Sequence, residues 1–214
     1  MKTMIALPCM DTVHTVFLRS LLGLDRPGET VFGITASSLV YDARNTLAKQ
    51  AIQENCDRIL WIDSDMEFSP DAMNRLAADM DEGHDFVTGL FFTRKAPVKP
   101  CIYEACGYAQ QDEQIAPVAL NYNDYPRDSL FEIKAAGLAF TMVNTKTVKA
   151  VMDKFGLPFS PMPGFGEDLS FCGRLQQLGI PMFCDSRVKI GHVGTGVINE
   201  DIYLAGRAKN VQSN

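Results

Sequence analysis

Residues 58–66, Arg-Ile-Leu-Trp-Ile-Asp-Ser-Asp-Met, decide the fold expected for this chain. An apolar run ends there in two carboxylates two positions apart, Asp63 and Asp65. A buried strand that stops in an acidic pair delivers the pair to the carboxyl edge of a parallel sheet, where open α/β folds bind ligands. Two aspartates at that edge suit a hard divalent cation and, through it, a phosphate-bearing substrate. The alternative is a strand that leaves the core into a polar turn, since Asp and Ser are common turn formers.

Strand and helix patterns alternate through the first 92 residues. Apolar residues recur at helical spacing over 40–55, and Ser69-Pro70 is typical of a helix start, with Ser69 as N-cap and Pro70 at the first helical position. Strands and helices that alternate at short intervals favour an α/β fold with a mostly parallel sheet and helices on both faces. The strands are expected at 3–8, 30–35, 58–62 and 86–91.

The alternation of strands and helices stops after residue 93, where prolines separate short extended segments. We expect residues 93–136 to form a small irregular β insertion laid over the edge of the sheet. The last dozen residues are expected to be mobile. Extended pieces are predicted near 101–109, 115–120, 130–136 and 138–143, helices at about 145–155 and 167–178, and a strand pair at about 181–190.

Composition excludes several classes of protein. The length of 214 residues fits one domain, and a net charge of −6 argues against a large nucleic-acid footprint. The six cysteines are scattered without a CxxC pair, so we expect buried thiols and a reduced, cytoplasmic setting. No apolar run is long enough to predict a membrane span.

Two further segments carry residues suited to chemistry. In the first, Gly164 and Gly166 would let the backbone approach a ligand, and Glu167-Asp168 fall in the first turn of a helix. Acidic residues in a first turn also simply complement the helix dipole. In the second, an alternating strand ends in His192 among glycines, which is a potential ligand or an ordinary surface residue.

The order of these segments resembles a metal-dependent glycosyltransferase of the GT-A fold. Residues 166–192 begin Gly-Glu-Asp-x-x-Phe-Cys-x-Arg-Leu and end in Gly-His, which is similar to the family-2-type members in particular. Pro8 after the first strand and Arg44-Asn45 in the helix before the acidic strand also fit. The resemblance spans about residues 3–192. No single motif is specific, but their order and spacing are.

The resemblance implies a metal site. Asp65 would bind Mn²⁺ or Mg²⁺, which bridges the two phosphates of a nucleotide-diphosphate sugar, and His192 would complete the coordination. Asp63 would face the ribose and reach the metal through water. Imidazole beside carboxylate and phosphate oxygens suits Mn²⁺ better than Ca²⁺.

The resemblance also implies sites for the donor and for catalysis. Pro8, the residues after it and Arg44 would line the base pocket, and Gly137 and Leu138 would sit under the donor sugar. Asp168 matches the position of the general base, with Glu167 beside it holding the acceptor. An inverting transfer needs such a carboxylate to take the proton of the acceptor hydroxyl.

The domain divisions follow from these assignments. We expect one GT-A-like domain, with a nucleotide-binding half at 1–92, an acceptor-side half at 93–194 and a C-terminal tail at 195–214. Arg94 and Lys95 would either neutralise phosphate or be solvated. The tyrosines of the insertion would either stack on sugar faces or pack in the core; they are Tyr103, Tyr108, Tyr122 and Tyr125.

We therefore predict an inverting glycosyltransferase that uses a UDP-linked sugar and an unknown carbohydrate, lipid-linked or protein acceptor. A sugar nucleotidyltransferase should carry a glycine-rich basic loop after its first strand, which residues 8–13 lack. An aspartyl-phosphate phosphohydrolase would place its acidic pair after the first strand, whereas here the pair follows the third. A non-catalytic nucleotide- or carbohydrate-binding module on the same fold is the remaining alternative.

Overall fold

A seven-stranded sheet forms the centre of the computed structural model, which describes residues 1–111, 114–194 and 196–211. Five strands run in one direction, while the fourth and the seventh in spatial order are antiparallel to their neighbours. The spatial order is β2 (Glu29–Ala36), β1 (Lys2–Cys9), β3 (Arg58–Ile62), β10 (Phe140–Asn144), β5 (Phe86–Leu90), β11 (Met182–Lys189) and β8 (Leu130–Ile133).

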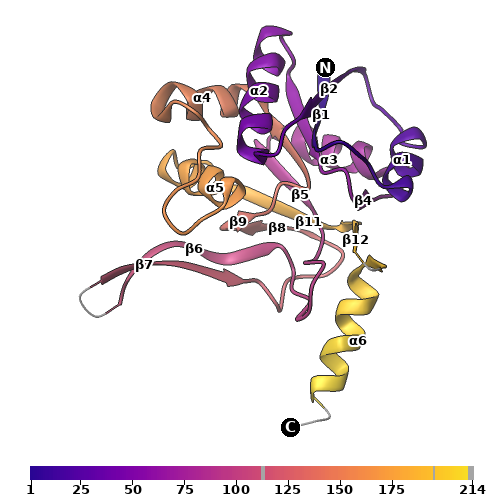
Figure 1. Ribbon diagram of the computed structural model, residues 1–214, viewed down its shortest axis with the longest axis vertical. Helices are drawn as coiled ribbons and strands as arrows, with labels where there is room; N and C mark the ends of the chain where they lie inside the picture. Colours follow the sequence, from indigo (N-terminus) through magenta and orange to yellow (C-terminus); the bar gives the residue numbers. More distant parts are fainter. Residues whose placement is uncertain (112–113, 195, 212–214) are drawn as a thin grey trace.

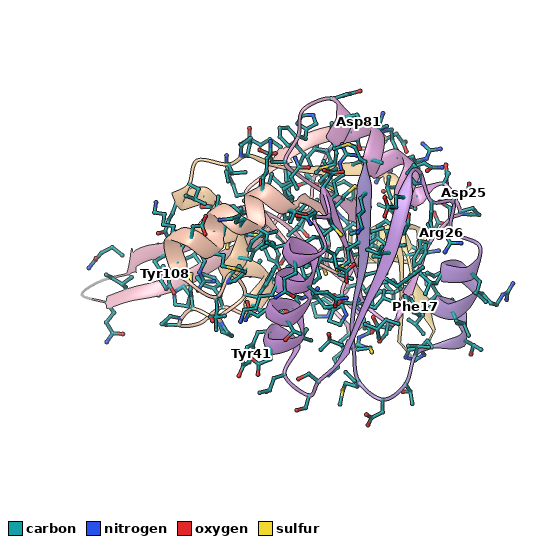
Figure 2. All side chains as sticks on the ribbon, turned by 90° about the horizontal axis from the view of Figure 1, so that it is seen from above. Phe17, Asp25, Arg26, Tyr41, Asp81 and Tyr108 are labelled. Carbon is teal, nitrogen blue, oxygen red and sulfur yellow. The ribbon has the colours of Figure 1, made fainter. Side chains whose placement is uncertain are left out.

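Helices cover both faces of this sheet (Figure 1). The first face carries α2 (Val40–Gln53), α4 (Thr145–Phe155) and α5 (Glu167–Gln177), and the second carries α1 (Thr15–Leu22) and α3 (Ala72–Asp81). Side chains of a strand alternate between its two faces. Accordingly Trp61 packs with the first group, whereas Leu60 and Ile62 pack with the second. Phe17 on α1 is buried on that second face (Figure 2).

This arrangement confirms the predicted fold class, a mixed and mostly parallel α/β sheet compatible with a Rossmann-like fold. A β insertion is present as predicted, but its hairpin is not laid over the edge of the central sheet. Strands β6 (Ile102–Gln111) and β7 (Gln114–Asn121) form a long hairpin that pairs with β9 (Ala135–Ala136). Figure 1 shows the hairpin projecting away from the central sheet. The piece that follows it, β8, joins the edge of that sheet.

A small second sheet ties the acidic segment to the histidine segment. Strand β12 (Gly191–Val193) lies between β4 (Met66–Glu67) and β13 (Val197–Ile198). The backbone N–H of Val193 also donates to the carbonyl of Asp65, at 2.8 Å. Residues 65 and 192 are therefore held side by side although they are far apart in the sequence.

Two local predictions were wrong. Helix α3 begins at Ala72 with Asp71 as its N-cap, two residues after the predicted start. Ser69 instead donates its hydroxyl to the Asp71 carboxylate at 2.6 Å, so it forms part of the turn before the helix. Residues 181–190 contain one strand, β11, rather than a pair, because β11 runs on through a bulge between Asp185 and Lys189.

The C-terminal segment contains a helix that was not predicted, and residues 212–214 of the tail expected to be mobile lie outside the described residues. Residues 200–211 form helix α6 (Glu200–Val211), which extends away from the sheet in Figure 1. Tyr203 fixes it, because its ring is buried and stacks on Phe92 at 4.7 Å between ring centroids. Arg207 adds an ion pair to Asp124 at 2.7 Å. Within the described residues no helix is both long and apolar enough to cross a membrane, and all six cysteines are free thiols.

A buried pair of carboxyls joins α3 to β11. Arg187 donates to Asp185 at 2.7 Å and to Asp79 at 3.0 Å, and both aspartates are almost fully buried. Burial, followed by the charge of Asp185 and a hydrogen bond with it, raises the pKa of Asp79 to about 7. The folded protein therefore keeps a proton that an unfolded Asp releases near 3.8.

This pair predicts a pH-dependent stability. Its contribution is fully present below pH 4 and is lost as the pH rises to about 7, because the folded state binds the extra proton in that window. In the wild type, this pair should lower the free energy of unfolding by about 1–3 kcal/mol as the pH rises across that window. In Asp79→Asn we expect this decrease to be absent. Urea titrations at several pH values measure it, with the exposed Asp153→Asn as control. An Asp79→Asn protein with an unchanged slope would contradict the assignment.

Candidate active site

A cleft opens at the carboxyl ends of β1 and β3, the edge at which the acidic pair was expected. Its volume is about 370 Å³. Asp63, Ser64 and Asp65 form one wall, the segment after β1 forms another, and Arg94 closes the rim. The remaining lining residues are Pro8, Cys9, Met10, Thr12, His14, Ser37, Ser38, Val40 and Ala43.

A larger hollow of about 620 Å³ lies at the opposite end of the strands. Its charged groups neutralise one another: Lys146 pairs with Asp85 at 3.1 Å, and Arg58 contacts Asp81. Open α/β sheets bind their ligands at the carboxyl ends of the strands. The smaller cleft is therefore the better candidate for an active site.

Asp65, which lines this cleft, contacts His192. The Oδ2 atom of Asp65 lies 3.5 Å from Nε2 of His192. The other ring nitrogen, Nδ1, lies 2.7 Å from the carbonyl oxygen of Phe92. A carbonyl oxygen only accepts, so Nδ1 donates to Phe92. A hydrogen bond from Nε2 to Asp65 then requires the doubly protonated ring, whereas in the neutral ring Nε2 is an unprotonated nitrogen available to a cation.

Asp65 is held in its ionised form. Burial would raise its pKa, but the hydrogen bond to His192 and the charges of His192 and Arg94 outweigh burial and lower the pKa. Arg94 makes the shortest of these contacts, 2.6 Å from its Nη1 to Asp65 Oδ2. The same carboxylate oxygen thus faces both an imidazole and a guanidinium.

Asp63 has a different partner. Arg44 donates to Asp63 at 2.8 Å and to Glu167 at 3.3 Å, and its guanidinium lies 5.5 Å from the centre of the Trp61 ring. The Arg44 side chain is only 2% exposed, whereas that of Asp63 is 32% exposed. Burial raises the pKa of Asp63, and the charge of Arg44 opposes this rise.

These contacts bear on two predictions. Arg44 does not line the cleft; it is buried beside it and braces Asp63 against Glu167. Asp63 pairs with Arg44 and lines the cleft with Asp65, so its roles toward the ribose and the metal stay predictions. Within the described residues no three His, Cys, Asp or Glu side chains lie close enough together to hold a metal ion. The protein therefore offers two clustered potential ligands, Asp65 and His192.

Asp168 lies in the first turn of α5 and beside Gly137. Burial and the neighbouring charge of Glu167 raise the pKa of Asp168 to about 6. A Cβ atom on Gly137 would lie 3.7 Å from Asp168 Oδ2 and only 2.9 Å from Phe91. The glycine therefore lets the Phe91 ring pack closely against the backbone beside this carboxylate. Leu138 next to it is buried in the core, so its side chain cannot support a sugar as predicted.

The tyrosines divide between core and surface. Tyr125 is buried, whereas Tyr108 is 43% exposed and donates its hydroxyl to the carbonyl of Pro163 at 2.8 Å. Its ring packs edge-on against Phe165, on the hairpin side of the molecule (Figure 2). Tyr103 and Tyr122 are partly buried. Of the four, Tyr108 is the one best placed to meet a ligand.

Three contacts of this site were missed by reasoning from the sequence. They are the Arg44–Glu167 bridge, the Arg94–Asp65 pair and the carbonyl of Phe92 that orients His192. Each joins residues that are distant in the chain. Only the Arg94–Asp65 pair had a signal in the sequence, which was the basic residue Arg94 shortly after a predicted strand.

Comparisons with known proteins support the fold. No family model matches the chain, and no curated protein matches its sequence. Among solved structures, A197 from STIV matches with a TM-score of 0.62 over 91% of this chain and 86% of A197. The two sequences are 18% identical, so the likeness shows a shared fold alone.

Proposed function

We propose that this protein is a metal-dependent glycosyltransferase that moves a sugar from a nucleotide-diphosphate sugar, with UDP as the nucleotide, to an acceptor hydroxyl with inversion. The observation that carries the proposal is the convergence of Asp65 with His192 at the cleft where the chain also presents Asp63. Asp168, at the start of α5 beside Gly137, supplies a carboxylate for the acceptor side.

Asp65 and His192 fit a divalent cation by their chemistry. One offers an ionised carboxylate, and the other offers an imidazole nitrogen freed by the hydrogen bond of Nδ1 to Phe92. This combination suits Mn²⁺ or Mg²⁺ with further oxygen ligands from substrate and water. When bound, the cation would supply positive charge that stabilises the diphosphate as the sugar–phosphate bond breaks.

The other steps belong to side chains of the protein. Asp168 accepts the proton of the acceptor hydroxyl, for which a pKa of about 6 leaves it ionised yet basic in neutral solution. Arg44 holds Asp63 in place for the ribose and Glu167 for the acceptor. Pro8 and the residues after β1 line the space for the base.

Binding of Mn²⁺ and UDP tests the site directly. Both together should raise the melting temperature, and Asp65→Ala should weaken UDP binding in the presence of Mn²⁺ by about 10- to 100-fold, the loss typical of perturbed metal sites. Asp128→Asn is the matched control, since Asp128 is exposed and its φ of 49° suits Asn. Isothermal titration calorimetry measures both variants. Unchanged UDP binding in Asp65→Ala would refute the proposal.

Activity is tested separately from binding. A screen of UDP- and GDP-sugars should reveal slow Mn²⁺-dependent hydrolysis of one donor, which a pure binding module would not catalyse. NMR of the anomeric proton in the product then distinguishes inversion from retention.

A further inference from the structure

We propose that Arg94 is an internal counter-ion of Asp65 that transfers to the diphosphate of the donor, so that nucleotide and cation bind cooperatively. This inference rests on the proposed function. It assigns to Arg94 a role in the order of binding, in addition to any contact with phosphate.

The first support is competition for one atom. Arg94 Nη1 lies 2.6 Å from Asp65 Oδ2, the oxygen that faces His192 Nε2 at 3.5 Å. A cation held between Asp65 and His192 would need this oxygen and would repel the guanidinium. Metal and Arg94 therefore exclude each other at the Asp65 carboxylate.

The second support is freedom of the side chain on a fixed backbone. The Arg94 side chain is 50% exposed and stands at the rim of the cleft. Its loop is closed by hydrogen bonds from the backbone N–H of Thr93 to the carbonyl of Lys99, 2.9 Å, and from Lys99 N–H to the Thr93 hydroxyl, 3.0 Å. The guanidinium can therefore turn away from Asp65 while its backbone stays in place.

The third support is the chemistry of the incoming group. A guanidinium presents paired N–H donors that match the oxygens of a phosphate. Once a cation takes Asp65, a diphosphate in the same cleft offers the displaced Arg94 a new anionic partner. The cation alone must break the Arg94–Asp65 pair without that compensation, so its affinity in the absence of nucleotide is reduced.

Lys95 provides a matched control. It carries the same charge one position later, it does not line the cleft, and it forms no ion pair within the described part of the chain. General loss of positive charge from this loop would affect Arg94→Gln and Lys95→Gln alike. A specific counter-ion role affects the first variant alone.

The experiment measures Mn²⁺ binding by electron paramagnetic resonance, and UDP binding by calorimetry, for wild type, Arg94→Gln, Arg94→Lys and Lys95→Gln. Without nucleotide, Arg94→Gln should bind Mn²⁺ about 3- to 5-fold more tightly, because a half-exposed ion pair no longer competes. With Mn²⁺ present it should bind UDP about 10-fold more weakly. By linkage, if UDP binding without metal is unchanged, the gain in Mn²⁺ affinity on adding UDP should shrink by the same factor of about 10.

The outcomes separate this inference from the proposed function. Arg94→Lys should fall between wild type and Arg94→Gln, and Lys95→Gln should match wild type. If wild type binds Mn²⁺ and UDP while Arg94→Gln shows unchanged or weaker Mn²⁺ affinity, the counter-ion role is wrong and the proposed function stands. If wild type binds neither, both are overturned.

Discussion

Replacement of Asp168 by Asn is expected to lower the rate constant of sugar transfer by about 10²- to 10⁴-fold. The amide keeps the shape of the side chain but cannot accept the proton of the acceptor hydroxyl. Affinity for UDP and Mn²⁺ should stay near the wild-type value, since Asp168 lies outside the cleft formed by Asp63 and Asp65. Single-turnover measurements with saturating donor separate the chemical step from binding.

The pH profile provides a second measurement of the same group. Asp168 must be ionised to act as a base, so the wild-type rate should fall as the pH drops through about 6 and level off above it. The rate of Asp168→Asn should not show this fall at low pH. Burial already favours the neutral carboxyl, so Asp168→Asn should fold normally. If Asp168→Asn keeps both the wild-type rate and the fall in rate at low pH, Asp168 is not the base.

Replacement of Arg44 by Met is expected to destabilise the fold by about 2–4 kcal/mol. Removing one partner of a buried ion pair leaves the other charge uncompensated, which typically costs about 3–5 kcal/mol. The lower range follows from the partial exposure of the Asp63 side chain, 32%. Met is an unbranched, uncharged side chain, so the loss reports the charge, its hydrogen bonds and its contact with the Trp61 ring.

Urea denaturation at neutral pH measures the effect. Arg44→Lys serves as the control, because it keeps the charge but cannot contact Asp63 and Glu167 with separate nitrogens. Its loss should be smaller than that of Arg44→Met. If Arg44→Met unfolds at the wild-type urea concentration, Arg44 does not brace the two acids.

The periodicity of the sequence was sufficient to predict most elements of the fold. The strand at 58–62 and the helix at 145–155 have the predicted bounds, because the first is an apolar run that ends at Asp63 and the second follows a strand with apolar residues at helical spacing. The direction of β10 could not be predicted. A fully buried strand carries no alternation and no mark of its direction, and only its pairing shows that it runs against β3 and β5.

The meeting of Asp65 with His192 was expected from the family resemblance, and the pairing of β12 with β4 brings it about. The burial of Arg44 could not be predicted in the same way. Its partner Glu167 belongs to a helix that follows the insertion, and the position of that helix depends on packing. Long-range ion pairs of this kind leave no local pattern.

Helix α6 was missed for a related reason. Apart from Tyr203 it shows little apolar periodicity, and Gly206 weakens its intrinsic helix propensity. Its stability comes from the ring of Tyr203 stacked on Phe92, a residue that precedes the insertion. A helix fixed by one aromatic contact is not visible in a search for an apolar stripe.

The antiparallel pairing of β5 with β10 makes residues 91–139 a single, very long hairpin connection between neighbouring strands. The hydroxyls of Thr88 and Thr141 join those strands in the core at 2.9 Å, independently of what the connection contains. A different connection grafted between Cys101 and Ala135 would exchange surface near Asp168 and remove the edge strand β8, while Phe92, Arg94 and Gly137 stay in the chain. The register that positions Asp63 would persist, so this segment is a natural place to redesign the proposed acceptor side.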